Sequence, residues 1–348
     1  MDLWYTRCPL PTASGIAIER GMLDAAFSPQ GISIRSLNAS PDRTVREAHY
    51  DHGQRGMFRQ GGSMPPIWSR SRGAETVVLA TSWVKEYQAL IALPESGIQG
   101  PAGLRGRRFG LPRRLNDPFD YWRAMCLCGL EKALRIAGLA MDDIEIVDLP
   151  VTERQIAEGG ASRTGTLWRG QARARRQSRE MLALIRGEVD IVYTASAPGA
   201  QLTAFAGAEV VVNIGEHPDA ALQANNQLPI ILTVDRGLLR DRPDVIVRYL
   251  QTLMDAAAWA TKHAEQALAI IAEDVSATRE WVLEANGANV HQTLQPALAA
   301  PHLEALESMK DFLLRHGYID RDFSIADWVD SDPIKQALLE RGAHATGI

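Results

Sequence analysis

The sequence predicts an α/β protein with two lobes and a ligand cleft between them. Short apolar or alternating runs typical of strands alternate with longer helical patterns along the chain. A stretch containing Gly and Pro at 95–102 and a second segment at 220–229, which ends in Pro229, indicate two crossings between the lobes. We expect residues 1–95 and 225–348 to form the first lobe, with the C-terminal helices packed on it, and residues 96–224 to form the second. In this architecture ligands bind between the lobes.

The first lobe should contain a largely parallel sheet. We expect its strands at residues 3–6, 31–37, 76–80, 87–93 and, after the second crossing, 230–234. The run 76–80 is apolar on both faces, which predicts a central strand. Thr12 or Ser14 can cap a helix that runs to about Phe27. Pro243 is typical of a helix start, and residues 245–339 should be mostly helical.

The second lobe should repeat this alternation of strands and helices. We expect its strands at residues 109–112, 144–149, 189–194 and 210–214. Helical patterns cover 117–138, where Gly138 ends the pattern, and 175–187.

Composition excludes several classes of protein. Of the 348 residues, 46% are hydrophobic and 23% are charged, which is ordinary for a globular chain. The net charge of −5 offers no basic excess for nucleic acid. No apolar run approaches the roughly 18 residues of a membrane helix, and the N-terminus lacks the regions of a secretory signal. Three cysteines cannot form a disulfide framework, so we expect a cytoplasmic protein. We also expect a monomer.

Cys8 is the first candidate for chemistry because it lies between a strand end and a predicted helix start. The positive end of a helix dipole and the neighbouring Arg7 both favour the reactive thiolate over the thiol. The alternative is a small buried packing residue. Cys126 and Cys128 lie in a helical pattern, where we expect such packing.

Arg59-Gln-Gly-Gly62 is a candidate anion site. The forked guanidinium of Arg59, beside the backbone N–H groups of Gly61 and Gly62, suits a carboxylate, sulfonate or sulfinate. A plain glycine turn is the alternative interpretation.

His49 and His52 are candidate partners of the cysteine, because a histidine can pair with a thiolate or relay a proton. Their spacing alone does not bring either to Cys8, and solvated loop histidines are the alternative.

Other patterns predict little chemistry. The sequence has no phosphate-loop, dinucleotide-binding, zinc-peptidase or nucleophile-elbow motif, so we expect no metal and no organic cofactor. We interpret a basic stretch as a solvated loop and helix face because the whole chain is acidic. It contains Arg163, Arg169, Arg173, Arg175, Arg176 and Arg179.

Two segments resemble those of periplasmic-binding-protein type II folds. They are 102–110 (AGLRGRRFG) and 183–190 (ALIRGEVD), which look like segments of sulfonate- and nitrate-type binding proteins. The resemblance implies a clamshell with a ligand cleft and says nothing of catalysis.

A set of motifs across nearly the whole chain resembles the 2'-hydroxybiphenyl-2-sulfinate desulfinase family, which catalyses the last step of dibenzothiophene desulfurisation. The motifs are Cys8-Pro-Leu-Pro11, Gly21–Ala26, Arg59-Gln-Gly-Gly62 with Pro65-Pro66, Tyr121–Ala124, Gly187–Asp190, 237–243 and 312–328.

The resemblance implies a cofactor-free hydrolase of the carbon–sulfur bond that converts an aryl sulfinate into sulfite and an arene. The family's catalytic cysteine falls on Cys8, its arginine on Arg59 and its sulfinate-binding glycine on Gly62. Its histidine falls on His49. Because the stretch before that position is longer here than in the family, a different alignment places Arg46 there instead.

The family's aromatic pocket is matched in part by Tyr50 and Trp122, and Trp68 is a further candidate for its wall. Cys8 would either attack sulfur as a thiolate or, as a thiol, protonate the ring carbon that bears sulfur. One alternative function is a non-enzymatic binding protein for an aromatic sulfonate, carboxylate or similar anion. Another is a cytoplasmic ligand sensor.

Overall fold

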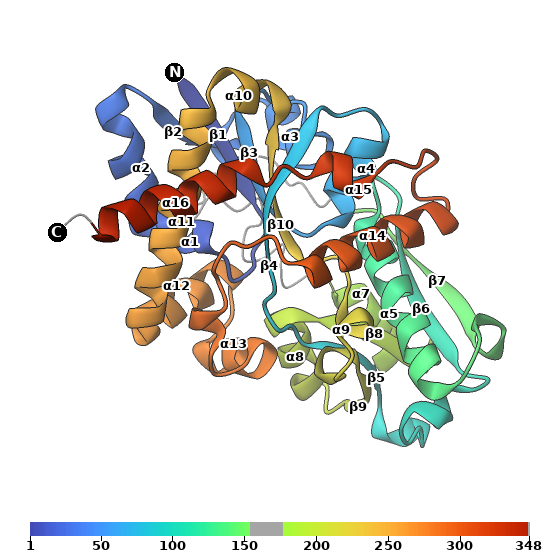
Figure 1. Cartoon of the computed structure of the whole chain (residues 1–348). Coiled ribbons are helices and arrows are strands. Elements are labelled where there is room, and N and C mark those ends of the chain that lie inside the picture. Colours follow the sequence, from blue (N-terminus) through green and yellow to red (C-terminus); the bar gives the residue numbers. More distant parts are fainter. Residues whose placement is uncertain (154–176, 347–348) are drawn as a thin grey trace.

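The computed structural model describes residues 1–153 and 177–346 and contains two five-stranded sheets flanked by helices (Figure 1). The strands of the first sheet are β1 (Asp2–Arg7), β2 (Ser33–Ser36), β3 (Met57–Gly61), β4 (Thr76–Ser82) and β10 (Ile230–Asp235). Those of the second are β5 (Gln88–Ala92), β6 (Arg108–Arg114), β7 (Glu145–Val151), β8 (Ile191–Ala195) and β9 (Glu209–Asn213). The strand orders are β2-β1-β3-β10-β4 and β7-β6-β8-β5-β9.

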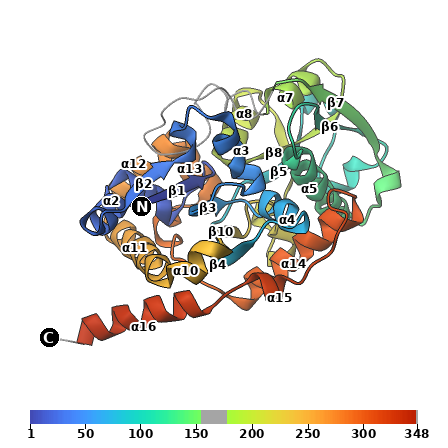
Figure 2. The ribbon, with the colours of Figure 1, turned by 90° about the horizontal axis from the view of Figure 1, so that it is seen from above.

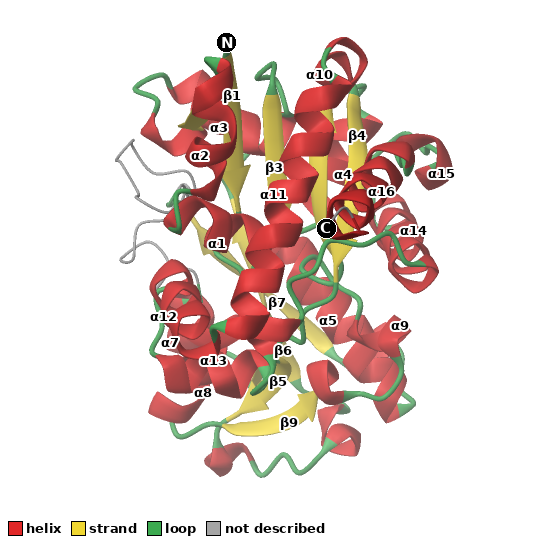
Figure 3. Cartoon of the chain, turned by 60° about the vertical axis from the view of Figure 1, so that its left-hand side comes forward, coloured by secondary structure: helices red, strands yellow, loops and turns green. Residues whose placement is uncertain are grey.

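Helices cover both sheets, and Figure 3 shows the first sheet above the second with α11 running along it. The helices before the second sheet are α1 (Ala13–Glu19), α2 (Met22–Phe27), α3 (Arg43–Asp51) and α4 (Met64–Ser71). Along the chain, from the second sheet to β10, the helices are α5 (Tyr121–Ala137), α7 (Ser178–Ile185), α8 (Ser196–Phe205) and α9 (Ala220–Gln223). The C-terminal ones are α10 (Arg236–Asp241), α11 (Pro243–Lys262), α12 (Ala264–Val275), α13 (Arg279–Asn286), α14 (Ala300–Arg315), α15 (Ile325–Trp328) and α16 (Asp332–Thr346). None of the described helices is long and apolar enough to cross a bilayer.

Both sheets are mixed, so the expectation of largely parallel sheets is wrong. The first strand after each crossing enters its sheet in the opposite direction. Strand β10 pairs antiparallel with β3 and β4, and β5 pairs antiparallel with β8 and β9. The other pairs, β1 with β2 and β3 and β6 with β7 and β8, are parallel.

The expected first boundary, at residue 95, is also wrong. Strand β5, which we assigned to the first lobe, lies in the second sheet, so the first crossing runs between Ser82 and Gln88. The Gly- and Pro-rich stretch after β5 is a connection within the second lobe, and its Leu104 is buried in the core. The second crossing runs from Asn213 to Ile230 and includes the expected stretch 220–229.

Strand β4 is buried without being central. It is the last strand in the order of the first sheet, but C-terminal segments extend that edge. Val78 bridges Val329, and Thr81 bridges Ala297. An apolar strand therefore needs cover on its edge, which here comes from residues more than 200 positions away along the chain.

The C-terminal helices cover both sheets, not only the first as we expected. Helices α11 and α12 pack on α1, and α16 packs on α11 at the rim of the molecule (Figure 2). However, α13 packs on α8, and α14 lies against α5, where Arg315 donates to Glu131 at 3.0 Å. Apolar side chains of α14, such as Leu306 and Phe312, are buried in the same cluster as residues of the second lobe.

The predicted helix after Cys8 is two helices. Thr12 caps α1, as one of the two expected alternatives, and accepts a hydrogen bond from the Gly15 N–H at 3.1 Å. The helix ends at Glu19 because Gly21 adopts a left-handed conformation with φ of 67°, and α2 follows.

Candidate active site

Strands β1 and β3 set out the candidate site on one face of the first sheet. They are parallel, with Thr6 opposite Arg59 and Arg7 opposite Gln60. Because side chains alternate along a strand, Thr6 and Arg59 face one side and Arg7 and Gln60 the other. Helix α3 covers the first side and contributes His49, whose ring contacts Thr6.

The thiol of Cys8 lies between a histidine and an arginine. Its Sγ is 3.8 Å from Nε2 of His49 and 3.8 Å from Nη2 of Arg59. A β-carbon at Gly61 would overlap this sulfur, so only glycine leaves room for the thiol there. The structure thus brings together the three residues expected to be catalytic, Cys8, His49 and Arg59, with Gly61 beside them.

Arg59 is fully buried, and its guanidinium is held by backbone carbonyls. Its Nε donates to the His49 carbonyl at 3.0 Å, and Nη1 donates to the Gly62 carbonyl at 2.9 Å. Only Nη2 faces the thiol, so the expected two-pronged grip on an anion is not what this geometry offers. Arg59 instead presents one nitrogen to the site while its other two fix its position.

His49 lies beside Cys8, whereas Arg46 does not. The imidazole is buried, and its Nδ1 lies 2.9 Å from the Thr6 hydroxyl. Burial, with a smaller effect of Arg59, lowers the pKa of His49 well below its usual value, so the ring is neutral. Arg46 turns away, and its Nη1 donates to the carbonyls of Ser40 and Pro41 at 2.8 and 2.9 Å.

His52 does not contact the thiol, and the alternative of a solvated loop is wrong for both histidines. Its ring is buried between the hydroxyls of Ser69 and Thr233, 3.0 Å from Nδ1 and 3.1 Å from Nε2 respectively. Burial lowers the pKa of His52 to about 3. We therefore infer that His52, at the C-terminal end of α3, has a structural role and no part in the chemistry.

Of the three sources of positive charge expected beside Cys8, Arg59 is in place, whereas Arg7 and the start of the helix are not. Arg7 points to the opposite face, where both of its terminal nitrogens pair with the buried carboxylate of Asp274. Helix α1 begins only at Ala13, five residues after the cysteine. Neither Arg7 nor the start of this helix therefore faces the sulfur.

Asn226 supports the glycine corner, although the sequence analysis did not find it. A β-carbon at Gly62 would lie 2.6 Å from the Asn226 amide. The Asn226 carbonyl accepts from the Ser63 N–H at 2.6 Å, and its Oδ1 accepts from the Met64 N–H at 3.0 Å. Such a role depends on the path of the second crossing, which no local pattern reveals.

The expected aromatic residues separate into two groups. Tyr50 lies at the site, with its ring 5.3 Å from that of His49 and 6.3 Å from that of Tyr121. Trp122, one position later on α5, instead points into the core, where its indole donates to Glu180. Trp68 stacks on Phe119 with ring centroids 5.6 Å apart, and no contact joins it to the thiol among the described residues.

The remaining sequence candidates lie away from this site. Cys126 and Cys128 are buried in α5, and burial raises the pKa of both thiols. Of the basic stretch, Arg179 pairs with Glu188 at 2.8 Å. The other five arginines, at positions 163 to 176, lie outside the described residues. No cluster of metal-ligating side chains occurs in the described part of the chain.

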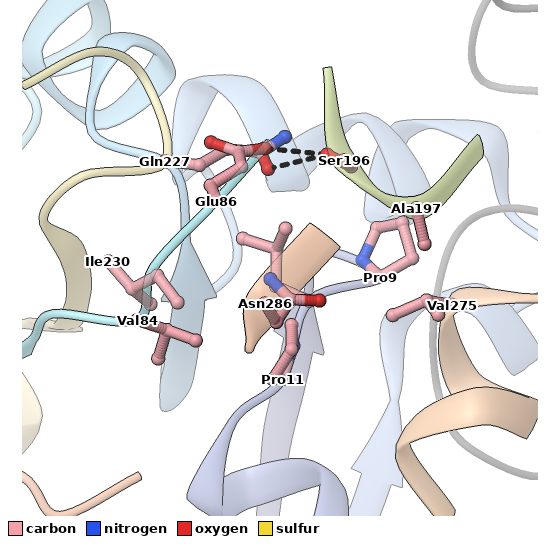
Figure 4. A pocket seen from close by; sticks show the side chains of 11 residues that line it. Pro9, Pro11, Val84, Glu86, Ser196, Ala197, Gln227, Ile230, Val275 and Asn286 are labelled. Atoms are coloured by element: carbon pink, nitrogen blue, oxygen red, sulfur yellow. Dashed lines mark hydrogen bonds between the residues drawn. The ribbon is translucent and has the colours of Figure 1, made fainter. Parts of the chain in front are cut away.

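A small pocket opens between the two sheets, next to the Cys8 loop (Figure 4). One end is polar, where the Ser196 hydroxyl contacts Glu86 at 2.6 Å and Gln227 at 3.1 Å. Its apolar wall consists of Pro9, Leu10, Pro11, Val84, Ala197, Ile230 and Val275. The pocket therefore begins at the residues that follow Cys8 and Asn226 in the chain.

No protein-family model matches the sequence. The chain is 28% identical over 360 residues to 2'-hydroxybiphenyl-2-sulfinate desulfinase of Rhodococcus erythropolis, covering 97% of this chain and 93% of that enzyme. The resemblance expected from the sequence motifs is confirmed. The chain is also 24% identical over 337 residues to a putative aliphatic sulfonates-binding protein of Bacillus subtilis strain 168, covering 95% and 86% of the two chains.

Solved structures agree with this likeness to the desulfinase. The crystal structure of the desulfurization enzyme DSZB matches with a TM-score of 0.76 and 25% identity, over 98% of this chain and 99% of that one. A cysteine-to-serine mutant of DSZB bound to biphenyl-2-sulfinic acid matches equally well, over 97% and 99%. The periplasmic sulphonate-binding protein SsuA of Escherichia coli shares the fold, with a TM-score of 0.65 and 16% identity over 95% and 92%. The periplasmic-binding-protein type II-like fold is thereby confirmed.

Proposed function

We propose that this chain is a desulfinase that hydrolyses the carbon–sulfur bond of an aryl sulfinate and releases sulfite and the arene. The observation that carries the proposal is the position of the Cys8 sulfur, 3.8 Å from both His49 and Arg59. Its likeness to a desulfinase over 97% of the chain supports the same reaction. A non-enzymatic binding protein would need no thiol at this point.

In this proposal the sulfinate binds between the first sheet and α3. Arg59 Nη2 and the N–H of Gly62 hold the sulfinate oxygens, and Gly61 leaves the space that the sulfur of Cys8 needs. Tyr50 lies against the anion. Trp122 does not contact the substrate in this proposal. Its hydrogen bond to Glu180 fixes the start of α5 and therefore the position of Tyr121. The arene extends toward the pocket between the sheets.

Two roles of Cys8 balance chemically. As a nucleophile, the thiolate forms a sulfur–sulfur bond while the carbon–sulfur bond breaks, a proton reaches the ring carbon, and water then releases bisulfite and the thiol. As an acid, the thiol gives its proton to the ring carbon, which keeps the electron pair of the broken bond. Sulfur dioxide leaves, and water converts it to bisulfite and a proton that restores the thiol.

The environment of His49 favours the acid role. A nucleophilic thiolate would need a separate proton donor for the ring carbon. His49 is neutral because burial and Arg59 lower its pKa, so it is a weak acid. With the thiol as proton donor, His49 has only to orient the S–H group, and the proton released when water converts sulfur dioxide to bisulfite returns to the Cys8 thiolate.

Incubation of the purified protein with benzenesulfinate and biphenyl-2-sulfinate, followed by a sulfite assay, tests the activity. We expect Cys8→Ser to abolish sulfite release and to retain sulfinate binding, because the hydroxyl is a much weaker acid. Cys126→Ser and Cys128→Ser are matched controls and should keep turnover, since both thiols are buried in α5. Sulfite release by Cys8→Ser at the wild-type rate would overturn the proposal.

Thiol labelling gives a second test that does not depend on turnover. Iodoacetamide should modify Cys8 first, because Cys126 and Cys128 are buried and their thiol pKa values are raised. Bound benzenesulfinate should protect Cys8.

A binding protein for an aromatic sulfonate or carboxylate is the second candidate function. The likeness to sulfonate-binding proteins in sequence and fold favours it. In that case the wild-type protein would bind benzenesulfonate and benzenesulfinate alike and release no sulfite.

As part of the first proposal, the enzyme acts as a monomer in the reducing cytoplasm, where its three free thiols persist.

A further inference from the structure

The hydroxyl of Tyr50 is buried and has no hydrogen-bond partner among the described residues. The side chain is only 1% exposed. A buried phenol normally finds a partner, because leaving a polar group unsatisfied is costly. Two other buried tyrosines, Tyr87 and Tyr193, follow this rule, with partners at 3.0 Å in Thr203 and Gln88.

The ring of Tyr50 lies beside His49, the histidine that faces the thiol. Tyr50 follows His49 on α3, and the edges of their rings meet at 87°. Burial is the main cause that raises the pKa of the Tyr50 phenol, and the charge of Cys8 adds a smaller effect in the same direction. Burial likewise lowers the pKa of the Arg59 guanidinium, and Cys8 and Tyr50 partly offset that shift. The phenol is therefore within electrostatic reach of both groups that flank the proposed anion site.

A sulfinate needs more donors than Arg59 supplies. Two of the guanidinium nitrogens are engaged by the carbonyls of His49 and Gly62, so only Nη2 faces the sulfur. A sulfinate has two oxygens, and each can accept more than one hydrogen bond. The site thus holds an orphaned donor beside a place where an anion would lack one.

We propose that the Tyr50 hydroxyl donates a hydrogen bond to an oxygen of the bound sulfinate, as a substrate-binding residue opposite Arg59. The inference rests on the proposed desulfinase function and assigns Tyr50 a polar role in addition to its place in the aromatic wall. Burial raises the pKa of this phenol well above its usual value, so it remains a donor throughout the working pH range.

Titration calorimetry of the Cys8→Ser protein with benzenesulfinate tests this role, because the ligand is not consumed. Adding Tyr50→Phe removes only the hydroxyl and should weaken binding roughly ten- to a hundredfold, as expected for a hydrogen bond to an anion. In the active protein, Tyr50→Phe should raise KM by a similar factor. Tyr87→Phe is the matched control and should leave affinity and KM unchanged.

Thermal unfolding without ligand separates binding from structure. Tyr50→Phe should leave Tm unchanged or raise it, since it removes an unsatisfied group. Tyr87→Phe should lower Tm, because it breaks a buried hydrogen bond to Thr203.

Two results would overturn the inference. If Tyr50→Phe bound benzenesulfinate as tightly as its parent, the hydroxyl would have no part in binding, while sulfite release by the wild type would still support the proposed function. If the Cys8→Ser protein bound no benzenesulfinate and the wild type released no sulfite, the function and the role of Tyr50 would both be wrong.

Discussion

The hydroxyl of Thr6 lies 2.9 Å from Nδ1 of His49, on the ring edge opposite the nitrogen that faces Cys8. Strand β1 produces this relation, because residues 6 and 8 are two positions apart and share one side of the sheet. The hydroxyl therefore fixes the ring from behind while Nε2 meets the thiol. Its part in the proposed reaction would be to hold the imidazole in place.

Thr6→Val keeps the shape of the side chain and removes this contact. Losing one hydrogen bond of about 0.5–1.5 kcal/mol should lower kcat roughly two- to tenfold. We expect KM to change little, because the Thr6 hydroxyl contacts His49 and is not among the groups proposed to hold the sulfinate. Steady-state kinetics with benzenesulfinate measures both.

Thr252→Val is the control for this substitution. Its hydroxyl donates to the Arg248 carbonyl within α11, at 2.8 Å, far from the thiol in the chain. It should keep kcat. Equal losses of kcat in the two variants would show that a general loss of stability, not His49, is responsible.

Gly61→Ala should remove the activity. The added β-carbon would overlap the Cys8 sulfur, so either the thiol or β3 must move. The same assay should show a loss of at least about a hundredfold, since small displacements of reacting groups have effects of this size. Gly342→Ala is the control, because no atom lies within 4 Å of its added carbon. A fully active Gly61→Ala protein would place the chemistry elsewhere.

Arg59→Lys should lower kcat/KM roughly ten- to a hundredfold, even though the positive charge is kept. A lysine cannot donate to the His49 and Gly62 carbonyls and also reach the thiol. Arg46→Lys is the matched control and also tests the alternative alignment of the family's histidine. It should leave kcat/KM close to the wild-type value, because Arg46 binds only the loop carbonyls of Ser40 and Pro41.

The sequence predicted the alternation of strands and helices well, because the apolar periodicity of the elements is local. Among the elements that it missed are β3 and the helices α3, α4 and α8. Strand β3 is only five residues long and contains the buried polar pair Arg59 and Gln60, so it lacks a strand pattern. Two signals were available, since Asp42 caps α3 and Pro65 and Pro66 lie at the start of α4.

The site was predicted in its members but not in its geometry. The motif around Cys8 and Arg59 could be recognised from the residues alone. Their meeting with His49 depends on the pairing of β1 with β3 and on the packing of α3, which are long-range. The orientation of Arg7 was the clearest error. It depends on Asp274, which lies 267 positions away.

Asp274→Asn should destabilise the protein strongly and leave the site intact. The carboxylate neutralises Arg7 in a fully buried pair, and removing one partner of such a pair typically costs about 3–5 kcal/mol. Urea unfolding measures this loss. Asp255→Asn breaks the more exposed pair with Arg341 and should cost at most about 1 kcal/mol. If the two losses were equal, burial of the Arg7 pair would not matter.

Two buried histidines, His49 within α3 and His52 at its C-terminal end, should make stability depend on pH. Burial lowers the pKa of His52 to about 3 and that of His49 well below 6.5, so the folded protein keeps both neutral. The unfolded chain binds their protons below an ordinary pKa of about 6.5. Unfolding therefore takes up protons, and stability falls as the pH drops below that value.

For two such groups, the free energy of unfolding should fall by roughly 2 kcal/mol between pH 6.5 and 5.5. Urea unfolding at several pH values measures the slope. His52→Asn removes one of the two groups and should remove about half of this slope, even though it also lowers the stability at pH 8.

Because His49 stays neutral, kcat/KM should show no imidazole titration between pH 5.5 and 7. A kcat/KM that fell with an apparent pKa near 6.5 would mean that His49 is exposed to solvent protons, against its burial beside Arg59.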